Sequence, residues 1–86
     1  MRFAAQVEVR LRPGIADPES ATIERALPAL GFDDVSAMTT GRSFRFEIEA
    51  GSGEEAMERA TALATRLLAN PVMEDAEVSV SARGGG

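Results

Sequence analysis

Carboxylates, hydroxyls and arginine are the side chains in this 86-residue sequence that could do chemistry. Histidine, cysteine, lysine, tyrosine and tryptophan are all missing from it. Most general bases and several covalent nucleophiles of enzymes come from those missing types. Without cysteine there is no disulfide framework and no thiolate to hold a metal. The sequence therefore predicts a chain with no catalytic residue, no metal site and no cofactor of its own.

Two adjacent acidic pairs, Asp33-Asp34 and Glu74-Asp75, come nearest to an acid–base site. Neighbouring residues on a strand point to opposite faces, so neither pair forms a ready dyad. The spacing of a calcium loop, Asp-x-Asp-x-Asp-Gly, does not occur either. Both pairs are interpreted as solvated loop acids.

The charge balance limits the partners that the chain can bind. Fourteen Asp and Glu face nine Arg, which gives a net charge of −5. A nucleic-acid binder needs a basic stripe, so no nucleic-acid partner is expected. Met1 leads directly into a strand pattern, and the longest apolar runs are too short to span a bilayer. We expect no signal peptide, no membrane partner and a cytoplasmic location.

The first half of the chain predicts a strand followed by a helix. Residues 2–12 alternate apolar and polar side chains, as a strand with one wet face does. Asp17 followed by Pro18 is typical of a helix start, since Asp caps free amides and Pro fits the first helical position. Pro28 predicts a kink or an early end of this helix, and Gly31 is a plausible C-terminal cap.

The second half repeats the strand and helix plan, and the whole predicts an α+β fold. The further elements expected are a weak strand at 35–40, a clear strand at 44–49, a helix from the Ser52–Glu55 capping box to the stop at Asn70-Pro71, and a last strand at 72–82. The order β-α-β-β-α-β is that of a ferredoxin-like plait, an antiparallel sheet with two helices on one face. Right-handed crossovers place its first and third strands at the centre. We expect a single domain over residues 1–82 and a flexible, Gly-rich tail at 83–86.

Three classes of function compete on such a plait. An acylphosphatase-type enzyme needs a basic phosphate-cradling loop after the first strand, but residues 13–17 carry one glycine, no arginine and an acid. An RNA-binding module displays aromatics on the open sheet face, whereas Phe44 and Phe46 share the core parity. A non-catalytic module remains, either an assembly subunit or a small dimeric ligand-binding regulatory module. Because fifteen alanines make the core thin, we expect a homodimer or a higher oligomer.

Four segments together resemble a known family. They are Val7-x-Val9-x-Leu11 leading to Asp17-Pro18, then Ala26-Leu27-x-x-Leu30-Gly31, then Gly41-Arg42-x-Phe44, and most specifically the nine residues from Leu67 to Asp75. Almost the whole chain is similar to PurS, the small subunit of phosphoribosylformylglycinamidine synthase. The sequence departs from that family's usual residues at Ser20, Thr39 and Ala76.

The resemblance implies a role in purine biosynthesis. The family's complex is a glutamine-dependent C–N ligase that converts formylglycinamide ribonucleotide, glutamine and ATP to formylglycinamidine ribonucleotide, glutamate, ADP and phosphate. A glutaminase subunit, PurQ, releases ammonia, and a synthetase subunit, PurL, uses it together with ATP and magnesium. The small subunit is implied to be a non-catalytic dimeric bridge that assists ammonia transfer.

Eight residues are the possible partner contacts: Asp17, Pro18, Gly41, Arg42, Asn70, Pro71, Glu74 and Asp75. Each also has a purely structural interpretation, as a helix cap, a turn glycine, a helix stop or a solvated charge. Arg42 is the best candidate for an interface cation, since the strands at 35–40 and 44–49 predict a hairpin whose tip projects from the sheet.

Overall fold

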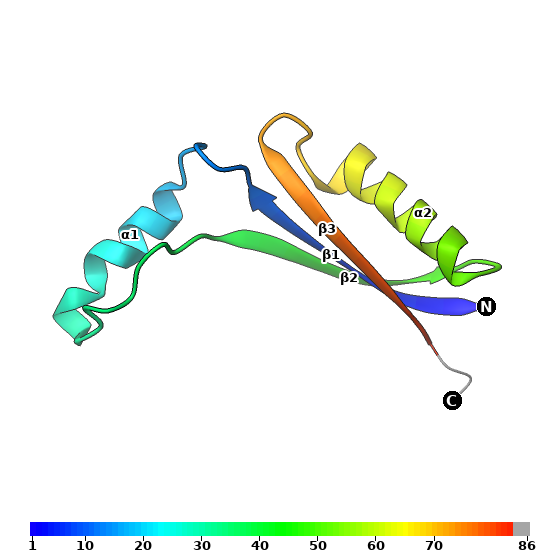
Figure 1. Ribbon diagram of the computed structural model, residues 1–86, viewed down its shortest axis with the longest axis horizontal. Coiled ribbons are helices and arrows are strands. Elements are labelled where there is room, and N and C mark those ends of the chain that lie inside the picture. Colours follow the sequence, from blue (N-terminus) through cyan, green and yellow to red (C-terminus); the bar gives the residue numbers. More distant parts are fainter. Residues whose placement is uncertain (84–86) are drawn as a thin grey trace.

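The computed structural model describes residues 1–83 and has an elongated, thin α+β shape (Figure 1). Its elements are β1 (Arg2–Leu11), α1 (Pro18–Ala26), a 3-10 turn (Pro28–Leu30), β2 (Gly41–Glu49), α2 (Gly53–Leu63), a π-helical turn (Ala64–Leu68) and β3 (Glu74–Ala82). The predicted α+β class with an antiparallel sheet is confirmed, and the arrangement is consistent with a ferredoxin-like plait. Of the predicted tail at 83–86, residues 84–86 lie outside the described residues.

Strand β1 is the centre of a three-stranded sheet with the order β2-β1-β3. Its partners are antiparallel on both sides, and Val7 lies opposite Phe44 on β2 and Val78 on β3. The odd-numbered side chains of β1 point to one face, where Phe3, Ala5, Val7 and Val9 are buried. The alternation predicted for residues 2–12 therefore marks the core strand correctly.

Helix α2 packs on the buried face through alanines. Ala56, Ala60 and Ala64 are each at most 1 % exposed and share one side of the helix and its π-helical extension. Such small side chains bring the helix close to the sheet but contribute little apolar area each. The only fully buried side chains larger than alanine among residues 1–83 are Val7 and Val9, so the core is thin.

The strand predicted at 35–40 is wrong. In the structure this segment is irregular chain with one bend, at Ala37, whose φ of 56° lies in the left-handed region. Two of its backbone amides donate to acids at the edge of α1: Met38 N–H to Glu24, and Thr40 N–H to Asp17. Because these N–H groups bind side chains, the segment does not pair with a strand, and the described sheet has three strands. Strand β2, predicted to be central, is an edge strand.

Residues 15–40, called the arm below, project beyond the end of the sheet (Figure 1). Helix α1 ends at Ala26 and a 3-10 turn begins at Pro28, as the proline predicted. Gly31 closes the turn with a φ of 90°, a conformation that glycine adopts without strain. Because α1 lies in this arm, α2 is the one helix of residues 1–83 that covers the sheet, and the expectation of two helices on one face is not met within this single chain.

Candidate partner-binding site

Six of the eight predicted contact residues come together at one end of the sheet, where β1 ends and both β2 and β3 begin. They are Gly41, Arg42, Asn70, Pro71, Glu74 and Asp75. The other two, Asp17 and Pro18, lie at the base of the arm, next to Gly41 through Thr40. Sequence reasoning thus selected residues that form one neighbourhood, although it gave no reason why they should meet.

Arg42 is bound within its own chain. Its Nη2 atom lies 3.0 and 3.2 Å from the two carboxylate oxygens of Glu74 and donates to the carbonyl of Leu68 at 3.2 Å. Its guanidinium also stands 5.5 Å from the centre of the Phe44 ring. The hairpin tip predicted for Arg42 does not exist, because the strand at 35–40 is missing. Arg42 instead ties the start of β2 to the end of α2 and the start of β3.

Glu74 and Asn70 fasten the α2–β3 connection, residues 69–73. The Glu74 carboxylate accepts the Asn70 N–H at 2.7 Å, and the Asn70 carboxamide oxygen accepts the N–H groups of Val72 and Met73. The pKa of Glu74 is lowered, chiefly by the Asn70 N–H. Desolvation, the next largest effect, opposes this change, and the hydrogen bond and charge of Arg42 add to the lowering. The acid is therefore a charged anchor of the connection rather than a proton-transfer group.

Arg12 holds the other side of the same connection. Its guanidinium donates to the carbonyl of Pro71 at 2.7 Å and pairs with Asp75 at 3.1 Å, while its own N–H donates to Met73. Arg12 is not among the eight residues that the sequence predicted as partner contacts. No local pattern identifies it, since the contact depends on how β1 and β3 pair.

Asp17 joins the two ends of the arm. Its carboxylate accepts the backbone N–H and the hydroxyl of Ser20 at 3.1 and 2.7 Å, as a helix cap, and also the N–H and hydroxyl of Thr40, both at 3.0 Å. These bonds, led by the Ser20 hydroxyl, lower the pKa of Asp17 to about 2. The predicted cap is confirmed, and the bond to Thr40 adds a closure at the base of the arm.

Gly41 is needed for a close approach between two strands rather than for a turn. A Cβ at this position would lie 2.4 Å from the carbonyl oxygen of Val9 on β1. Atoms do not approach so closely, so a side chain here would push β2 away from β1. The predicted turn glycine is thus the first residue of β2.

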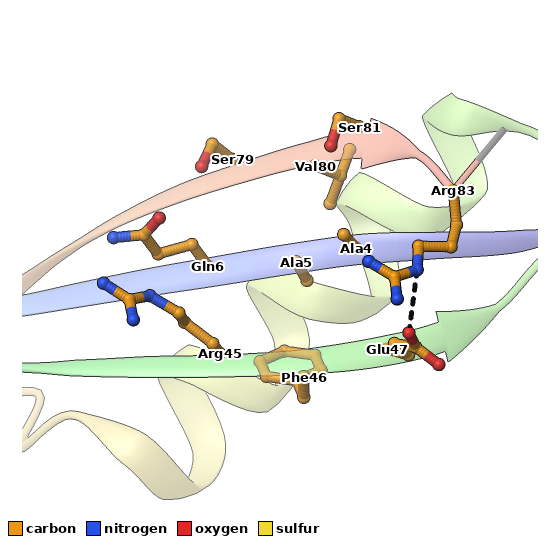
Figure 2. A pocket seen from close by; sticks show the side chains of 10 residues that line it. All are labelled: Ala4, Ala5, Gln6, Arg45, Phe46, Glu47, Ser79, Val80, Ser81 and Arg83. Atoms are coloured by element: carbon orange, nitrogen blue, oxygen red, sulfur yellow. Dashed lines mark ion pairs between the residues drawn. The ribbon is translucent and has the colours of Figure 1, made fainter.

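The sheet face opposite α2 is polar and open. It holds a shallow groove of about 450 Å³ beside Gln6, Arg45 and Ser79, with an ion pair of 3.0 Å between Arg83 and Glu47 (Figure 2). Within the described part of the chain, no cluster of three or more potential metal-ligating side chains occurs. Over the same residues, no helix is long and apolar enough to cross a membrane.

Comparison with known proteins places the chain in one family. Residues 4–82 match the family model of PurS, phosphoribosylformylglycinamidine (FGAM) synthase. The PurS subunit of the Archaeoglobus fulgidus enzyme is 43 % identical over 70 residues, 81 % of this chain and 88 % of that protein. A crystal structure of Methanocaldococcus jannaschii PurS is 35 % identical, with a TM-score of 0.81 over 92 % of this chain and 95 % of that one. A chain of the Thermotoga maritima PurLQS structure is 33 % identical, with a TM-score of 0.86 over 94 % and 99 %. With its fold and nearly its whole length matched, the chain belongs to the PurS family of FGAM synthase subunits.

Proposed function

We propose that this chain bridges the synthetase and glutaminase subunits of an FGAM synthase complex and contributes no catalytic group. The main support for the absence of a catalytic group is that four predicted site residues bind groups of their own chain. These residues are Asp17, Arg42, Asn70 and Glu74. Their role is to shape the molecule, and the surface that this shape presents carries several large exposed apolar side chains. Such surfaces are typical of protein–protein contacts. The PurLQS assembly of the Thermotoga maritima relative supports the same partners, PurL and PurQ.

The proposed reaction belongs to the whole complex. Formylglycinamide ribonucleotide, glutamine and ATP become formylglycinamidine ribonucleotide, glutamate, ADP and phosphate, and ATP and magnesium are held by the synthetase. The bridge brings the glutaminase close enough for ammonia to pass before it escapes into water. We place this reaction in the cytoplasm, and the net charge of −5 argues against a nucleic-acid partner.

We also propose that the chain is a homodimer, with the arm as its main contact. Five large apolar side chains of the arm are between 39 % and 70 % exposed: Ile15, Ile23, Leu30, Phe32 and Val35. Helix α2 lies mainly over β3 and β1, so Phe44, Phe46 and Ile48 on β2 stay only half-buried. A second copy's arm would supply the helix that this side of the sheet lacks. A two-fold exchange of arms would cover both surfaces at once.

The dimer is tested by light scattering of the purified chain. We expect a dimer at tens of micromolar, roughly ten times a micromolar dissociation constant. The double variant Leu30→Ser with Phe32→Ser should be monomeric but folded, since both side chains are exposed in the single chain. The matched control Met57→Ser, on the exposed side of α2, should remain a dimer. A monomeric wild-type chain would contradict the proposal.

The bridging role is tested by measuring whether the two partner enzymes assemble in the presence and absence of this chain. The synthetase and the glutaminase of the same organism are mixed with and without this chain and followed by sedimentation, with nucleotide and glutamine present. We expect the two enzymes to sediment together only when the chain is added. Co-sedimentation that does not need the chain would contradict a bridging role.

A further inference from the structure

Strand β3 lies at the edge of the sheet, and β1 is its one neighbouring strand within residues 1–83. At one end of this pair the N–H of Arg12 donates to the carbonyl of Met73. At the other end the N–H of Arg83 donates to the carbonyl of Arg2. In an antiparallel pair, residues bonded to the neighbour alternate with residues whose N–H and C=O point away from it. The odd-numbered residues of β3 therefore bond to β1, and the even-numbered residues turn their backbone groups outward.

The outward groups of Glu74, at the start of β3, are already bound. Its N–H donates to the carbonyl of Asn70, and its own carbonyl accepts the Arg12 side chain at 3.4 Å. Within residues 1–83, no hydrogen bond engages the outward backbone groups of the next four even-numbered residues. They are Ala76, Val78, Val80 and Ala82. We call residues 76–82 the free edge.

The free edge lacks the features that commonly keep the edges of sheets apart. Natural sheets protect an exposed edge strand with proline, lysine or a β-bulge. Residues 76–82 contain neither proline nor lysine, and the register with β1 is unbroken along the strand. Glu77 is the one charged residue of the free edge. The backbone of β3 is thus open to pairing with another strand.

The free edge complements a second copy of itself in one two-fold antiparallel register. With Ser79 on the axis, Val78 lies opposite the second copy's Val80, and Ala76 opposite its Ala82. Each outward N–H and C=O of these four residues then has a partner.

Neighbouring two-fold registers do not achieve this. An axis at Val78 would need the outward groups of Glu74, which Asn70 and Arg12 already hold. An axis at Val80 would leave Ala76 without a partner among residues 1–83. The bonds already made by Glu74 therefore select the register with Ser79 on the axis.

The side chains on the open sheet face are compatible with this register. Asp75 would lie opposite the second copy's Arg83, and Glu77 opposite its Ser81. Opposite charges across a strand pair stabilise it, whereas like charges destabilise it. No two like charges lie directly opposite each other along the pair.

On the other face, a groove of about 200 Å³ lies between α2 and β3. Its lining includes the small side chains of Thr61, Thr65, Ala76 and Val78. Side chains directly opposite on one face of a strand pair are in contact range. The second copy's Val80 and Ala82 would therefore stand beside Val78 and Ala76 and fill this groove.

We propose that the free edge pairs with the free edge of a second copy about a two-fold axis at Ser79, which joins the two sheets into one. The β2 edge of a second copy is a poorer occupant, because its Glu49 carbonyl is bound by the Arg59 side chain. Pairing of β3 with β2 would also leave an unpaired edge on each copy, so the assembly would not close.

This contact is separate from the arm contact proposed above. The arm contact lies on the β2 side, and the order β2-β1-β3 places the free edge on the other side of the sheet. The side chains that meet at the free edge are small, so they bury little apolar area. We expect the pairing to be weaker than the arm contact and to leave the oligomer at tens of micromolar, roughly a micromolar-affinity threshold, unchanged.

The register is tested by disulfide trapping, since the chain has no cysteine of its own. In the proposed pair the two Ser79 residues form a non-hydrogen-bonded pair with Cα atoms about 4.5 Å apart, which a disulfide can span. The two Ser81 residues would lie about 13 Å apart along the strands, too far for a disulfide. Both serines are exposed, so folding should be kept, and melting curves check it.

Purified Ser79→Cys and Ser81→Cys are oxidised separately with glutathione disulfide and followed on non-reducing gels. We expect Ser79→Cys to form the covalent pair at least about tenfold faster than Ser81→Cys. A mixture of Ser81→Cys with Glu77→Cys should form the mixed pair rapidly, because these positions face each other in the proposed register. Ser43→Cys, an exposed position on β2, measures the rate of random collision.

Equal rates for Ser79→Cys and Ser81→Cys, or a faster Ser81→Cys, would overturn the register. A Ser79→Cys rate no higher than that of Ser43→Cys would overturn the pairing and leave the free edge to a strand of another protein. The same order of rates is expected in the arm variant, Leu30→Ser with Phe32→Ser. A monomeric wild-type chain at tens of micromolar would contradict the arm contact alone, whereas loss of the fast reaction in the arm variant would overturn a separate contact at β3.

Discussion

The arm and the connection between α2 and β3 are held by the same kind of hydrogen bond, but these bonds attach them to different parts of the molecule. In both, a carboxylate accepts backbone N–H groups: Asp17 from Ser20 and Thr40, and Glu74 from Asn70. Glu74, on β3, is also bound by Arg42 of β2, the strand on the other side of β1, so its segment is fixed to the sheet. Asp17 ties the arm only to its own return segment. The arm therefore has its internal shape fastened while its apolar side stays exposed, whereas the connection between α2 and β3 is fastened to the sheet.

A substitution at Gly41 should have the largest effect on stability, because this residue lies where both regions meet the sheet. Gly41→Ala places a Cβ 2.4 Å from the Val9 carbonyl, so β2 must shift away from β1. We expect a loss of about 1–3 kcal/mol in the free energy of unfolding, measured by urea denaturation. Gly53→Ala is the matched control, since its Cβ would be 3.9 Å from the nearest atom, on the Phe3 ring. Equal stability of the two variants would show that β1 and β2 tolerate a side chain at position 41.

The pH dependence of the melting temperature tests how Asp17 closes the base of the arm. Its pKa is about 2 in the folded chain against an ordinary value of 3.8. A carboxyl with a lowered pKa stabilises the fold above its unfolded value and loses that contribution as the pH falls through the folded value. The melting temperature of Asp17→Asn should therefore lie several degrees below that of the wild type above about pH 4, and the gap should close near pH 2. A gap that is the same at pH 7 and pH 2 would contradict the role of the charge.

Arg42 should have a smaller effect, confined to the sheet end. Arg42→Gln removes the ion pair with Glu74 but keeps a polar side chain, and the wild-type arginine is more than half exposed. Surface pairs of this kind contribute little to global stability. We expect a melting temperature within a few degrees of wild type but several-fold faster hydrogen exchange of the Val72 and Met73 amides. Arg45→Gln, on the open sheet face, is the control and should leave both amides unchanged.

The last prediction is that small ligands do not change the melting temperature. If the chain were a ligand-binding regulatory module, an amino acid or nucleotide would stabilise it by mass action. The groove beside Arg45 and Gln6 is the place where such a ligand would bind. We predict no saturable rise in melting temperature with millimolar amino acids or nucleotides. A clear saturable shift, abolished by Arg45→Gln, would favour the regulatory function over the bridge.

Local signals predicted most of the fold and much of the neighbourhood of the site. The alternation of residues 2–12, the cap at Asp17 and the stop at Pro28 each depend on nearby residues alone. The strand at 35–40 was wrong because its backbone donors bind Asp17 and Glu24, contacts that a strand pattern does not reveal. The position of α1 beyond the sheet was not predicted either, because the order of elements does not say which helix covers the sheet.

The candidate site also depends on contacts that local sequence patterns do not reveal. Asn70 and Pro71 were selected as a helix stop and Arg42 as a projecting cation, yet their meeting depends on the register of β1 with both neighbours. Arg12 enters the site for the same reason. Its partners, Pro71 and Asp75, are separated from it by some sixty positions in the chain. Long-range pairing of this kind has no signature in a single sequence.

The most direct test of the bridge compares two sources of nitrogen in a reconstituted complex. Glutamine-driven product formation needs ammonia to pass from the glutaminase to the synthetase, whereas high external ammonium needs only the synthetase site. Leaving out this chain should abolish the glutamine-driven reaction and largely spare the ammonium-driven one. Equal loss of both reactions would show that the chain supports the synthetase active site itself, and would contradict the bridge.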